Sequence, residues 1–498
     1  MSTKNSAELY DKYVAITQKA ADLNYASAVL GWDQEVYMPP KGEQFRGRQL
    51  ATLSTLAHEM LTSKEYGELL QQLSQAEPDE TQAANIRLSI EDYEKNKQLP
   101  SSFIDELTRQ TSASYNAWMK ARKANDFSIY APELEKMIQL KRKQAELYGF
   151  EGHPYDALLD DYEKGATVAM LDPIFESLKK DLPPLLQKLQ QLHFNDGFFY
   201  RDYPKQQQWD FSMAVLKKMG YDMEAGRQDI SEHPFTTSFA PTDVRVTTRV
   251  DEHNFASLLW SSIHEGGHAL YEQGLPEEQY GLPLGAAASL SIHESQSRLW
   301  ENCVGRSKDF WKYFYIQLQG EFPRALFDIT QEHFWEGVNK VQPSLIRTEA
   351  DEVSYHFHVM IRYEIEKALI EGSLDVKDLK QAWNDMYREY IGVTPKDDLT
   401  GVLQDIHWSH GSFGYFPTYS LGSFYAAQFF QQAQKDIVGL NHQIASGEFT
   451  ELLKWLRKNI HRHGRRYRSD ELCKMVTGKG LSLASFMSYL NDKYANAR

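Results

Sequence analysis

The chain has 498 residues, of which 42% are hydrophobic and 25% are charged, a composition that excludes a largely disordered protein and permits a large buried core. The formal net charge of -15 disfavours a nucleic-acid binder, because such a surface repels phosphates on average. No stretch approaches the roughly eighteen consecutive apolar residues of a membrane span, and charges interrupt the first residues. We therefore expect no membrane association and a cytoplasmic location.

The two cysteines, Cys303 and Cys473, lie far apart in the sequence and in no metal-binding or redox spacing. This spacing argues against a disulfide framework and against a zinc cluster held by thiolates. We expect both side chains to be buried free thiols.

Apolar residues recur three and four positions apart in several stretches, which is the period of an amphipathic helix. These stretches are 8–30, 46–60, 129–148, 355–370 and 421–435. The segment GWDQEVYMPPKG at 31–42 predicts a turn between two helices. Few stretches alternate with period two, and the clearest of them, 243–250, predicts a strand. Because no linker is visible, we predict an all-α, mostly helical fold with a small β-hairpin or sheet, and a single domain over 1–498.

The strongest chemical signal is the HExxH pattern formed by His264, Glu265 and His268. Two histidines four apart on a helix project from one face and can reach a single ion, and the glutamate beside them can act on water. Gly266 and Gly267 weaken such a helix. We expect these glycines to leave space for a substrate backbone.

A catalytic zinc needs a third protein ligand and one open position. The long form of the motif is excluded, because Tyr271 and Gly274 stand where it requires glycine and histidine. Glu294, in SIHESQSRLW at 291–300, is the candidate third ligand. A structural alternative exists, because Ser291 and Glu294 also match a helix capping box.

HEGGHALYEQG and SIHESQSRLWEN resemble segments of the zinc metallocarboxypeptidases typified by carboxypeptidase Taq. Further matching segments follow in the family's order, namely HPF at 233–235, DVRVT at 243–247, IRTEAD at 346–351 and GVLQDIHW at 401–408. GWDQEVYMPPKG and HRHGRRY match as well, so the resemblance covers nearly the whole chain.

This resemblance implies a saddle-shaped helical body with two lobes flanking a deep central cleft, akin to angiotensin-converting enzyme and neurolysin, with active-site segments in 233–419. It implies dependence on Zn²⁺, one ion per subunit, or on Co²⁺ in its place. It also implies a homodimer that releases amino acids one at a time, with broad specificity, from peptides with a free carboxyl end.

In the mechanism we expect, His264, His268 and Glu294 hold the metal, and Glu265 is the general base and acid. The developing oxyanion needs a further hydrogen-bond donor. Tyr419 and His410 are the candidates, because their segment resembles the donor segment of angiotensin-converting-type enzymes. The alternative for the tyrosines here is packing in an aromatic wall.

A carboxypeptidase must bind the substrate carboxylate, and arginine can bind both oxygens at once. The candidates are Arg347 and Arg245, which Asp351 and Asp243 respectively would hold in place, and a structural ion pair is the alternative for each. We also expect His233 and Tyr415 to contact substrate.

Other polar groups near these motifs are expected to support the site without binding the metal: His293, Gln404, Asp405 and His407. Position 298 is arginine, where some related zinc peptidases have an aspartate that supports a ligand histidine. The support of the ligand histidines must therefore be built differently here.

Three other functions remain open on the sequence. The chain could be a zinc endopeptidase of the neurolysin type, or a helical scaffold that keeps the motif without turnover, although a scaffold has no need of Glu265. The basic segment 454–468 could bind a polyanion, but a solvated helix face or a subunit contact is the commoner use of such a run.

Overall fold

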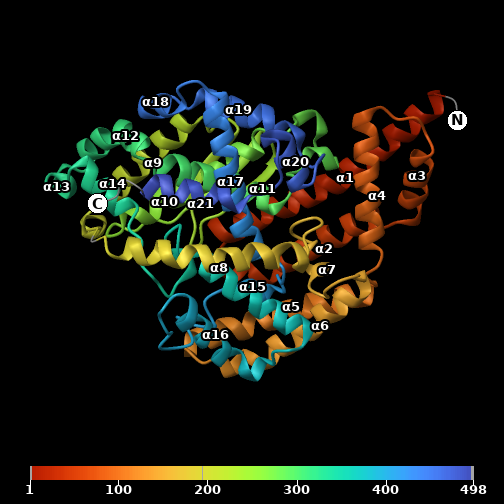
Figure 1. Cartoon of the computed structure of the whole chain (residues 1–498). Helices are drawn as coiled ribbons and strands as arrows, with labels where there is room; N and C mark the ends of the chain where they lie inside the picture. Colours follow the sequence, from red (N-terminus) through yellow and green to blue (C-terminus); the bar gives the residue numbers. More distant parts are fainter. Residues whose placement is uncertain (1–2, 193, 495–498) are drawn as a thin grey trace.

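A computed structural model describes residues 3–192 and 194–494, and helices dominate it (Figure 1). The chain begins with a long helix that folds back on the next one, and further helices lead to a small sheet. The helices before the sheet are α1 (Thr3–Val36), α2 (Glu43–Leu61), α3 (Lys64–Ser74), α4 (Glu80–Asn96), α5 (Ser101–Ala124), α6 (Ala131–Tyr148), α7 (Asp156–Leu159), α8 (Val168–Gln190) and α9 (Lys205–Met219).

The sheet has three short strands in the order β1-β3-β2, namely β1 (Gly226–Ile230), β3 (Asp243–Thr248) and β2 (Thr236–Ala240). The central strand pairs parallel with β1 and antiparallel with β2. Val244 and Val246 on β3 are fully buried, as the alternating pattern predicts. The strand expected at 243–250 is thus confirmed over Asp243–Thr248, two residues shorter than predicted, whereas its two partners carry no such alternation and were not predicted individually.

Helices also make up most of the rest of the chain, with one seven-residue π-helical segment, Leu299–Gly305, among them. The helices are α10 (Phe255–Glu272), α11 (Leu290–Arg298), α12 (Lys308–Glu321), α13 (Pro323–Leu326), α14 (Gln331–Val338), α15 (Tyr355–Glu371), α16 (Val376–Tyr390), α17 (Pro417–Asp436), α18 (Leu440–Ala445), α19 (Thr450–Asn459), α20 (Ser469–Thr477) and α21 (Leu483–Tyr494).

The five stretches predicted to be helical from their period fall within α1, α2, α6, α15 and α17, apart from a residue or two at the start of α6. The predicted turn at 31–42 is too long, because α1 continues to Val36. Trp32 gives a physical reason for the longer helix. Its indole is buried against the sheet, where the Arg245 guanidinium lies 4.4 Å from the ring centroid.

The apolar core forms one large cluster that runs from α5 to α21 and a smaller one at the amino-terminal end. The smaller cluster joins α1, α3 and α4 around Tyr13, Tyr66 and Leu70. In Figure 1, α8 crosses the molecule between a group that contains α10, α11 and α17 and a group that contains α5, α6 and α16. The expected class, mostly helical with a small sheet, is confirmed.

Cys303 and Cys473 are both buried free thiols, as expected. Across residues 3–192 and 194–494, no helix combines the length and the apolarity needed to cross a bilayer.

Candidate active site

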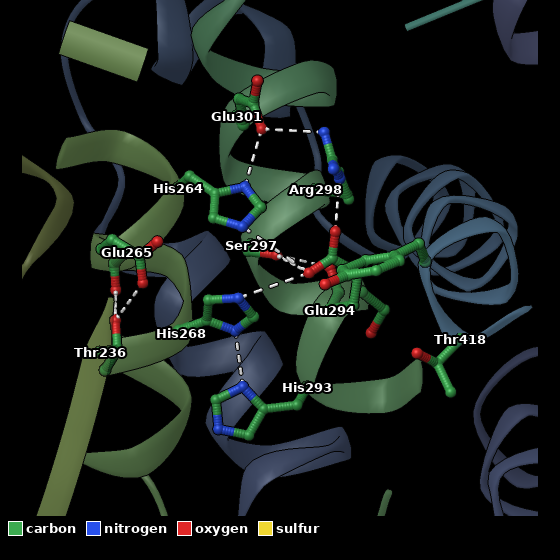
Figure 2. A network of polar contacts seen from close by, with 12 residues as sticks. Thr236, His264, Glu265, His268, His293, Glu294, Ser297, Arg298, Glu301 and Thr418 are labelled. Carbon is green, nitrogen blue, oxygen red and sulfur yellow. Dashed lines mark hydrogen bonds and ion pairs between the residues drawn. The ribbon is translucent and has the colours of Figure 1, made fainter. Parts of the chain in front are cut away.

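The HExxH residues lie on α10, a helix whose apolar side is buried. Leu258, Leu259 and Ile263 are at most 1% exposed, so this helix is anchored in the core. His264 and His268, one turn apart, both point toward α11 (Figure 2). The spacing in the sequence therefore places both imidazoles on one face, as predicted.

Glu294 on α11 completes a group of three side chains that could bind one metal ion. We call His264, His268 and Glu294 the metal-type group. Its Oε2 lies 3.7 Å from Nε2 of His264 and 3.4 Å from Nε2 of His268. The three ligand atoms all lie within 4.8 Å of one another. Tetrahedral zinc with bonds of about 2.0–2.2 Å holds its ligand atoms roughly 3.3–3.6 Å apart. The distances from Glu294 to the two histidines are close to this separation, so this donor set fits a zinc ion.

The alternative role for Glu294, closing a helix start as part of a capping box, is wrong. The first turn of α11 is capped by Ser289, whose side chain accepts a hydrogen bond from the Ile292 amide. The carboxylate of Glu294 instead accepts hydrogen bonds from Arg298 Nε at 2.6 Å and Ser297 Oγ at 3.2 Å.

Two glycines let neighbouring helices approach α11 closely. A Cβ at Gly267 would lie 2.7 Å from the Cα of Ser297, and a Cβ at Gly422 on α17 would lie 2.5 Å from Cγ of Glu294. The expectation that Gly266 and Gly267 open space for substrate is therefore wrong. Gly266 instead faces Leu216 of α9, and Gly267 permits the helix contact that brings Glu294 to the histidines.

His264 is fixed by carboxylates at both ring nitrogens. Its Nδ1 donates to Glu301 Oε2 at 2.8 Å, and Glu301 is held in turn by Arg298 and Arg306. Burial lowers the pKa of His264, but the charges of Glu294 and Glu301 outweigh burial and raise it overall. The buried carboxylates therefore make this position favourable for a cation.

His268 is supported by a second chain of hydrogen bonds (Figure 2). With Nε2 facing the ligand group, Nδ1 donates to Nδ1 of His293 at 2.6 Å, and Nε2 of His293 donates to Glu272 at 2.8 Å. Burial lowers the pKa of His268, so its imidazole is neutral, as metal binding requires.

Glu265 lies beside the two histidines on α10, next to Thr236 at the edge of the sheet (Figure 2). The Thr236 hydroxyl on β2 donates to the Glu265 carboxylate at 2.7 Å and lies 2.9 Å from its backbone carbonyl. Glu265 is 8% exposed, so the strand edge holds a nearly buried carboxylate beside the ligand helix.

Arg347 is buried and is held by Asp405, not by Asp351 as expected. Its Nε donates to Asp405 Oδ1 at 2.9 Å and its Nη1 to the Tyr355 hydroxyl at 3.0 Å. Asp351 instead accepts from the backbone amides of Val353 and Ser354. Tyr355 also lies under the guanidinium of Arg298, 4.5 Å from its ring centroid, so this tyrosine connects Arg347 with the metal-type group.

Tyr415 and Tyr419 form an aromatic wall next to Arg347. Their ring centroids are 5.2 Å apart, and the Arg347 guanidinium lies 4.9 Å from the Tyr419 ring. His407 Nε2 lies 3.1 Å from the Tyr419 hydroxyl. Burial raises the pKa of Tyr415 to about 12 and that of Tyr419 well above its usual value, and it lowers the pKa of His407 to about 3. The phenols therefore remain hydrogen-bond donors and the imidazole stays neutral.

Three predicted site residues lie in other surroundings. His410 is exposed, with its ring 5.3 Å from that of Tyr115, and no hydrogen bond among the described residues joins it to the metal-type group. His233 is exposed between β1 and β2. Arg245 is held by both oxygens of Asp243, as expected, at 2.8 and 2.9 Å.

The sequence analysis missed several residues that complete the site. Glu301, Glu272, Thr236 and Tyr355 support the metal-type group, Glu265 or Arg347. Only Glu301 carried a usable signal, because it lies two helical turns after Glu294. The other contacts form between segments distant in sequence, which no local pattern reveals.

Two surface cavities, of about 190 and 770 Å³, lie beside α4 and α20, and neither is lined by His264, His268 or Glu294. They adjoin the basic segment, where Arg465 pairs with Asp92 and Arg466 with Glu80. The donor chemistry, not the size of a cavity, therefore locates the candidate active site.

A mostly helical chain with an HExxH helix and a glutamate third ligand has the site of a metallopeptidase. Comparison with known proteins agrees, because the model of the carboxypeptidase Taq (M32) metallopeptidase family matches residues 12–494. The chain belongs to this family and is therefore a metallocarboxypeptidase, a peptide hydrolase that uses a divalent metal.

Individual relatives agree over nearly the whole chain. Thermostable carboxypeptidase 1 of Thermus thermophilus is 41% identical over 501 residues, which cover 98% of each chain. The M32 carboxypeptidase of Deinococcus radiodurans superimposes with a TM-score of 0.96 at 37% identity, covering 98% of this chain and 99% of that one. A solved structure described as "The Structure of CHT" is 57% identical, also with a TM-score of 0.96, covering 98% of this chain and 100% of that one.

Proposed function

We propose that the chain is a zinc-dependent carboxypeptidase that releases amino acids one at a time from the carboxyl end of peptides, with broad specificity. The observation that carries this proposal is the convergence of His264, His268 and Glu294, with Glu265 on the same helix and a buried arginine nearby. His264, His268 and Glu294 would hold zinc, and cobalt would be able to replace it.

When bound, the metal supplies Lewis-acid polarisation of a carbonyl oxygen and of water. Glu265 accepts a proton from the attacking water and later delivers it to the leaving amine, so that the new C–O bond replaces the C–N bond. Thr236 orients the carboxylate for both transfers through the 2.7 Å hydrogen bond.

The oxyanion that develops during attack needs donors beyond the metal site. We assign this role to the phenol of Tyr419, with Tyr415 beside it, because burial keeps both hydroxyls protonated. His407 lies within hydrogen-bond distance of Tyr419 and orients it. The sequence suggests His410 as the histidine donor, but His407 is the histidine that contacts Tyr419 and is the better candidate.

Arg347 is the better candidate for binding the substrate carboxylate. Its described hydrogen bonds use Nε and Nη1, and among the described residues Nη2 has no partner. A carboxylate bound there would place the last residue of the peptide beside the aromatic wall of Tyr415 and Tyr419. Arg245 and His233, near the sheet edge, would contact parts of the peptide farther from its carboxyl end.

The test is digestion of matched peptides with free and amidated carboxyl ends, followed by mass spectrometry, with and without a chelator and with zinc or cobalt restored. We expect a ladder that loses one residue at a time from the free peptide only, abolished by the chelator. Internal cleavage of both peptides would instead indicate an endopeptidase of the neurolysin type, and absence of cleavage with metal bound would indicate a scaffold.

The family resemblance further leads us to propose a cytoplasmic homodimer with one zinc ion per subunit, which acts on peptides and binds neither nucleic acid nor membranes. Sedimentation equilibrium of the zinc-loaded protein tests the dimer, for which twice the 57.6 kDa chain mass is expected. A single species at the chain mass would contradict it.

A further inference from the structure

Glu366 on α15 is a fully buried carboxylate outside the metal-type group and the substrate contacts described above. Its Oε1 accepts a hydrogen bond from Trp408 Nε1 at 2.8 Å. Its Oε2 accepts from the Gly414 amide at 2.8 Å and from the Tyr155 hydroxyl at 2.5 Å. Three donors on one buried carboxylate offset much of the cost of its burial.

Two of these donors bracket a short loop that leads to the aromatic wall. Trp408 directly follows His407, and Gly414 directly precedes Tyr415. Glu366 therefore binds the chain at both ends of 408–414, next to the imidazole and the phenol that face the candidate active site. Both ends of this loop thus donate hydrogen bonds to one side chain of another helix, α15.

The backbone conformation of this loop is also constrained at Gly414. Gly414 has a φ of +100°, and a Cβ there would lie 2.6 Å from the Leu158 carbonyl. The chain thus passes close to α7 in a backbone conformation that residues other than glycine rarely adopt. The backbone amide of Gly414 itself donates to the Glu366 carboxylate, so this hydrogen bond fixes the chain immediately before Tyr415.

We propose that Glu366 is a positioning residue for the hydrolysis, which acts through Trp408 and Gly414 to hold His407 and Tyr415 in place beside the metal-type group. This proposal rests on the proposed donor role of the tyrosines. Burial raises the pKa of Glu366 to about 7, and the three donors stabilise the ionised form that accepts all of them.

Replacement of Glu366 by glutamine tests the proposal, because it exchanges one of the two acceptor oxygens of the carboxylate for an NH₂ group, which is a donor. In one orientation its NH₂ group faces Trp408 Nε1, and in the other it faces the Gly414 amide, so one hydrogen bond is lost in either case. The matched control is Glu364→Gln on the same helix, whose carboxylate contacts Lys179 and Tyr390. Glu366→Asp keeps two acceptor oxygens on a shorter side chain.

The measurements are kcat and KM of the zinc-loaded enzyme on a peptide with a free carboxyl end, the zinc dissociation constant and the unfolding midpoint. We expect Glu366→Gln to lower kcat by about 10- to 100-fold, the size of effect that a small misplacement of catalytic groups produces. KM and zinc affinity should stay within about twofold. Glu366→Asp should recover part of kcat, and Glu364→Gln should match the wild type.

A double-mutant cycle separates positioning from a general loss of packing. If Glu366 acts through Tyr415, then Glu366→Gln combined with Tyr415→Phe is no slower than the slower single variant. Additive losses, or a loss confined to zinc affinity or to the unfolding midpoint, would overturn the proposal. Full activity in Tyr415→Phe would overturn the donor role of Tyr415. The same cycle would then be measured with Tyr419→Phe, and additive losses in that cycle would overturn the positioning role of Glu366.

If Glu366→Gln fails to fold, Trp408→Phe provides the second variant, because it removes the indole donor and keeps an aromatic ring in the same place. Its kcat should fall in the same direction, without a change in zinc affinity. An unchanged kcat in Trp408→Phe would contradict the proposed path through this residue.

Discussion

At the scale of single residues, the site combines three groups carried by α10 with a carboxylate from α11 and supporting groups from distant segments. His264, Glu265 and His268 share one helix, so their relation follows from helical geometry alone. Glu294 comes from the next helix, and its carboxylate lies close to both histidines. Contacts that depend on tertiary structure, such as Asp405 on Arg347 or Thr236 on Glu265, could not be read from spacing.

Glu265→Gln should retain metal and lose turnover. The amide cannot accept the proton of the attacking water, so kcat should fall by about 10²- to 10⁴-fold, whereas the three ligand side chains are untouched. Steady-state kinetics and metal content by atomic absorption check this expectation. Activity within tenfold of the wild type would mean that another group is the general base.

Glu301→Gln should weaken metal binding without removing a ligand. Its carboxylate orients His264 through the 2.8 Å hydrogen bond to Nδ1, and loss of such support lowers metal affinity by about 10- to 100-fold. Competition with a chromophoric chelator measures the zinc dissociation constant. The control is Glu332→Gln, an exposed carboxylate paired with Lys308, for which zinc affinity should not change.

At the scale of elements, the sequence predicted the positions of helices along the chain better than the contacts between them. The apolar period placed α1, α6, α15 and α17 within a few residues, because a helix that packs on a core must repeat its apolar side chains. The extension of α1 to Val36 was missed, since Trp32 is buried by stacking on Arg245 of a strand more than two hundred residues away. Likewise, the sequence does not indicate which helix each glycine of α10 faces.

Gly267→Ala should separate α10 from α11. Alanine favours a helix by about 1 kcal/mol over glycine, but a Cβ placed 2.7 Å from the Ser297 Cα forces overpacking that costs about 1–3 kcal/mol. Zinc affinity should fall, because the same contact sets the distance between Glu294 and the histidines. Calorimetry and zinc competition measure both effects.

Gly320→Ala is the control for that substitution. Gly320 lies within α12 and a Cβ there meets nothing within 4 Å, so the alanine variant should be at least as stable as the wild type. If Gly267→Ala behaved like Gly320→Ala in both measurements, the close contact between the helices would not control the site.

At the scale of the whole molecule, composition and period were enough to predict a mostly helical protein, because both reflect burial, which is a global property. The small sheet was only partly predicted. Strand β3 alternates, whereas β1 and β2 are five residues each and gain their structure from pairing with it. That the domain is single over 1–498, with two lobes, stays a prediction.

The free energy of unfolding should decrease as the pH falls below about 6.5. Burial lowers the pKa of His356 and of His461 to about 3, so in the folded protein both stay neutral where the unfolded chain takes up protons at its usual pKa of about 6.5. Each therefore contributes stability above that pH, which is lost progressively as the pH falls toward 3. At pH 5 the loss is on the order of 2 kcal/mol for each histidine.

Urea unfolding between pH 5 and pH 8 measures this slope. His461→Asn should show a shallower dependence than the wild type, because it removes one of the buried histidines whose pKa is lowered in the folded protein. An equal slope in both proteins would mean that His461 titrates in the folded protein as it does in the unfolded chain. Exposed His253, replaced by asparagine, is the control and should leave the slope unchanged.

The two carboxylates that bracket the His264 ring also limit how the chain can change in length. Glu294 and Glu301 reach opposite nitrogens of one imidazole from a single continuous stretch that runs from α11 into the π-helical segment. One residue inserted or deleted between them would rotate one carboxylate by about 100° relative to the other. This stretch should therefore accept almost no insertion or deletion, whereas connections elsewhere on the surface are free to vary in length.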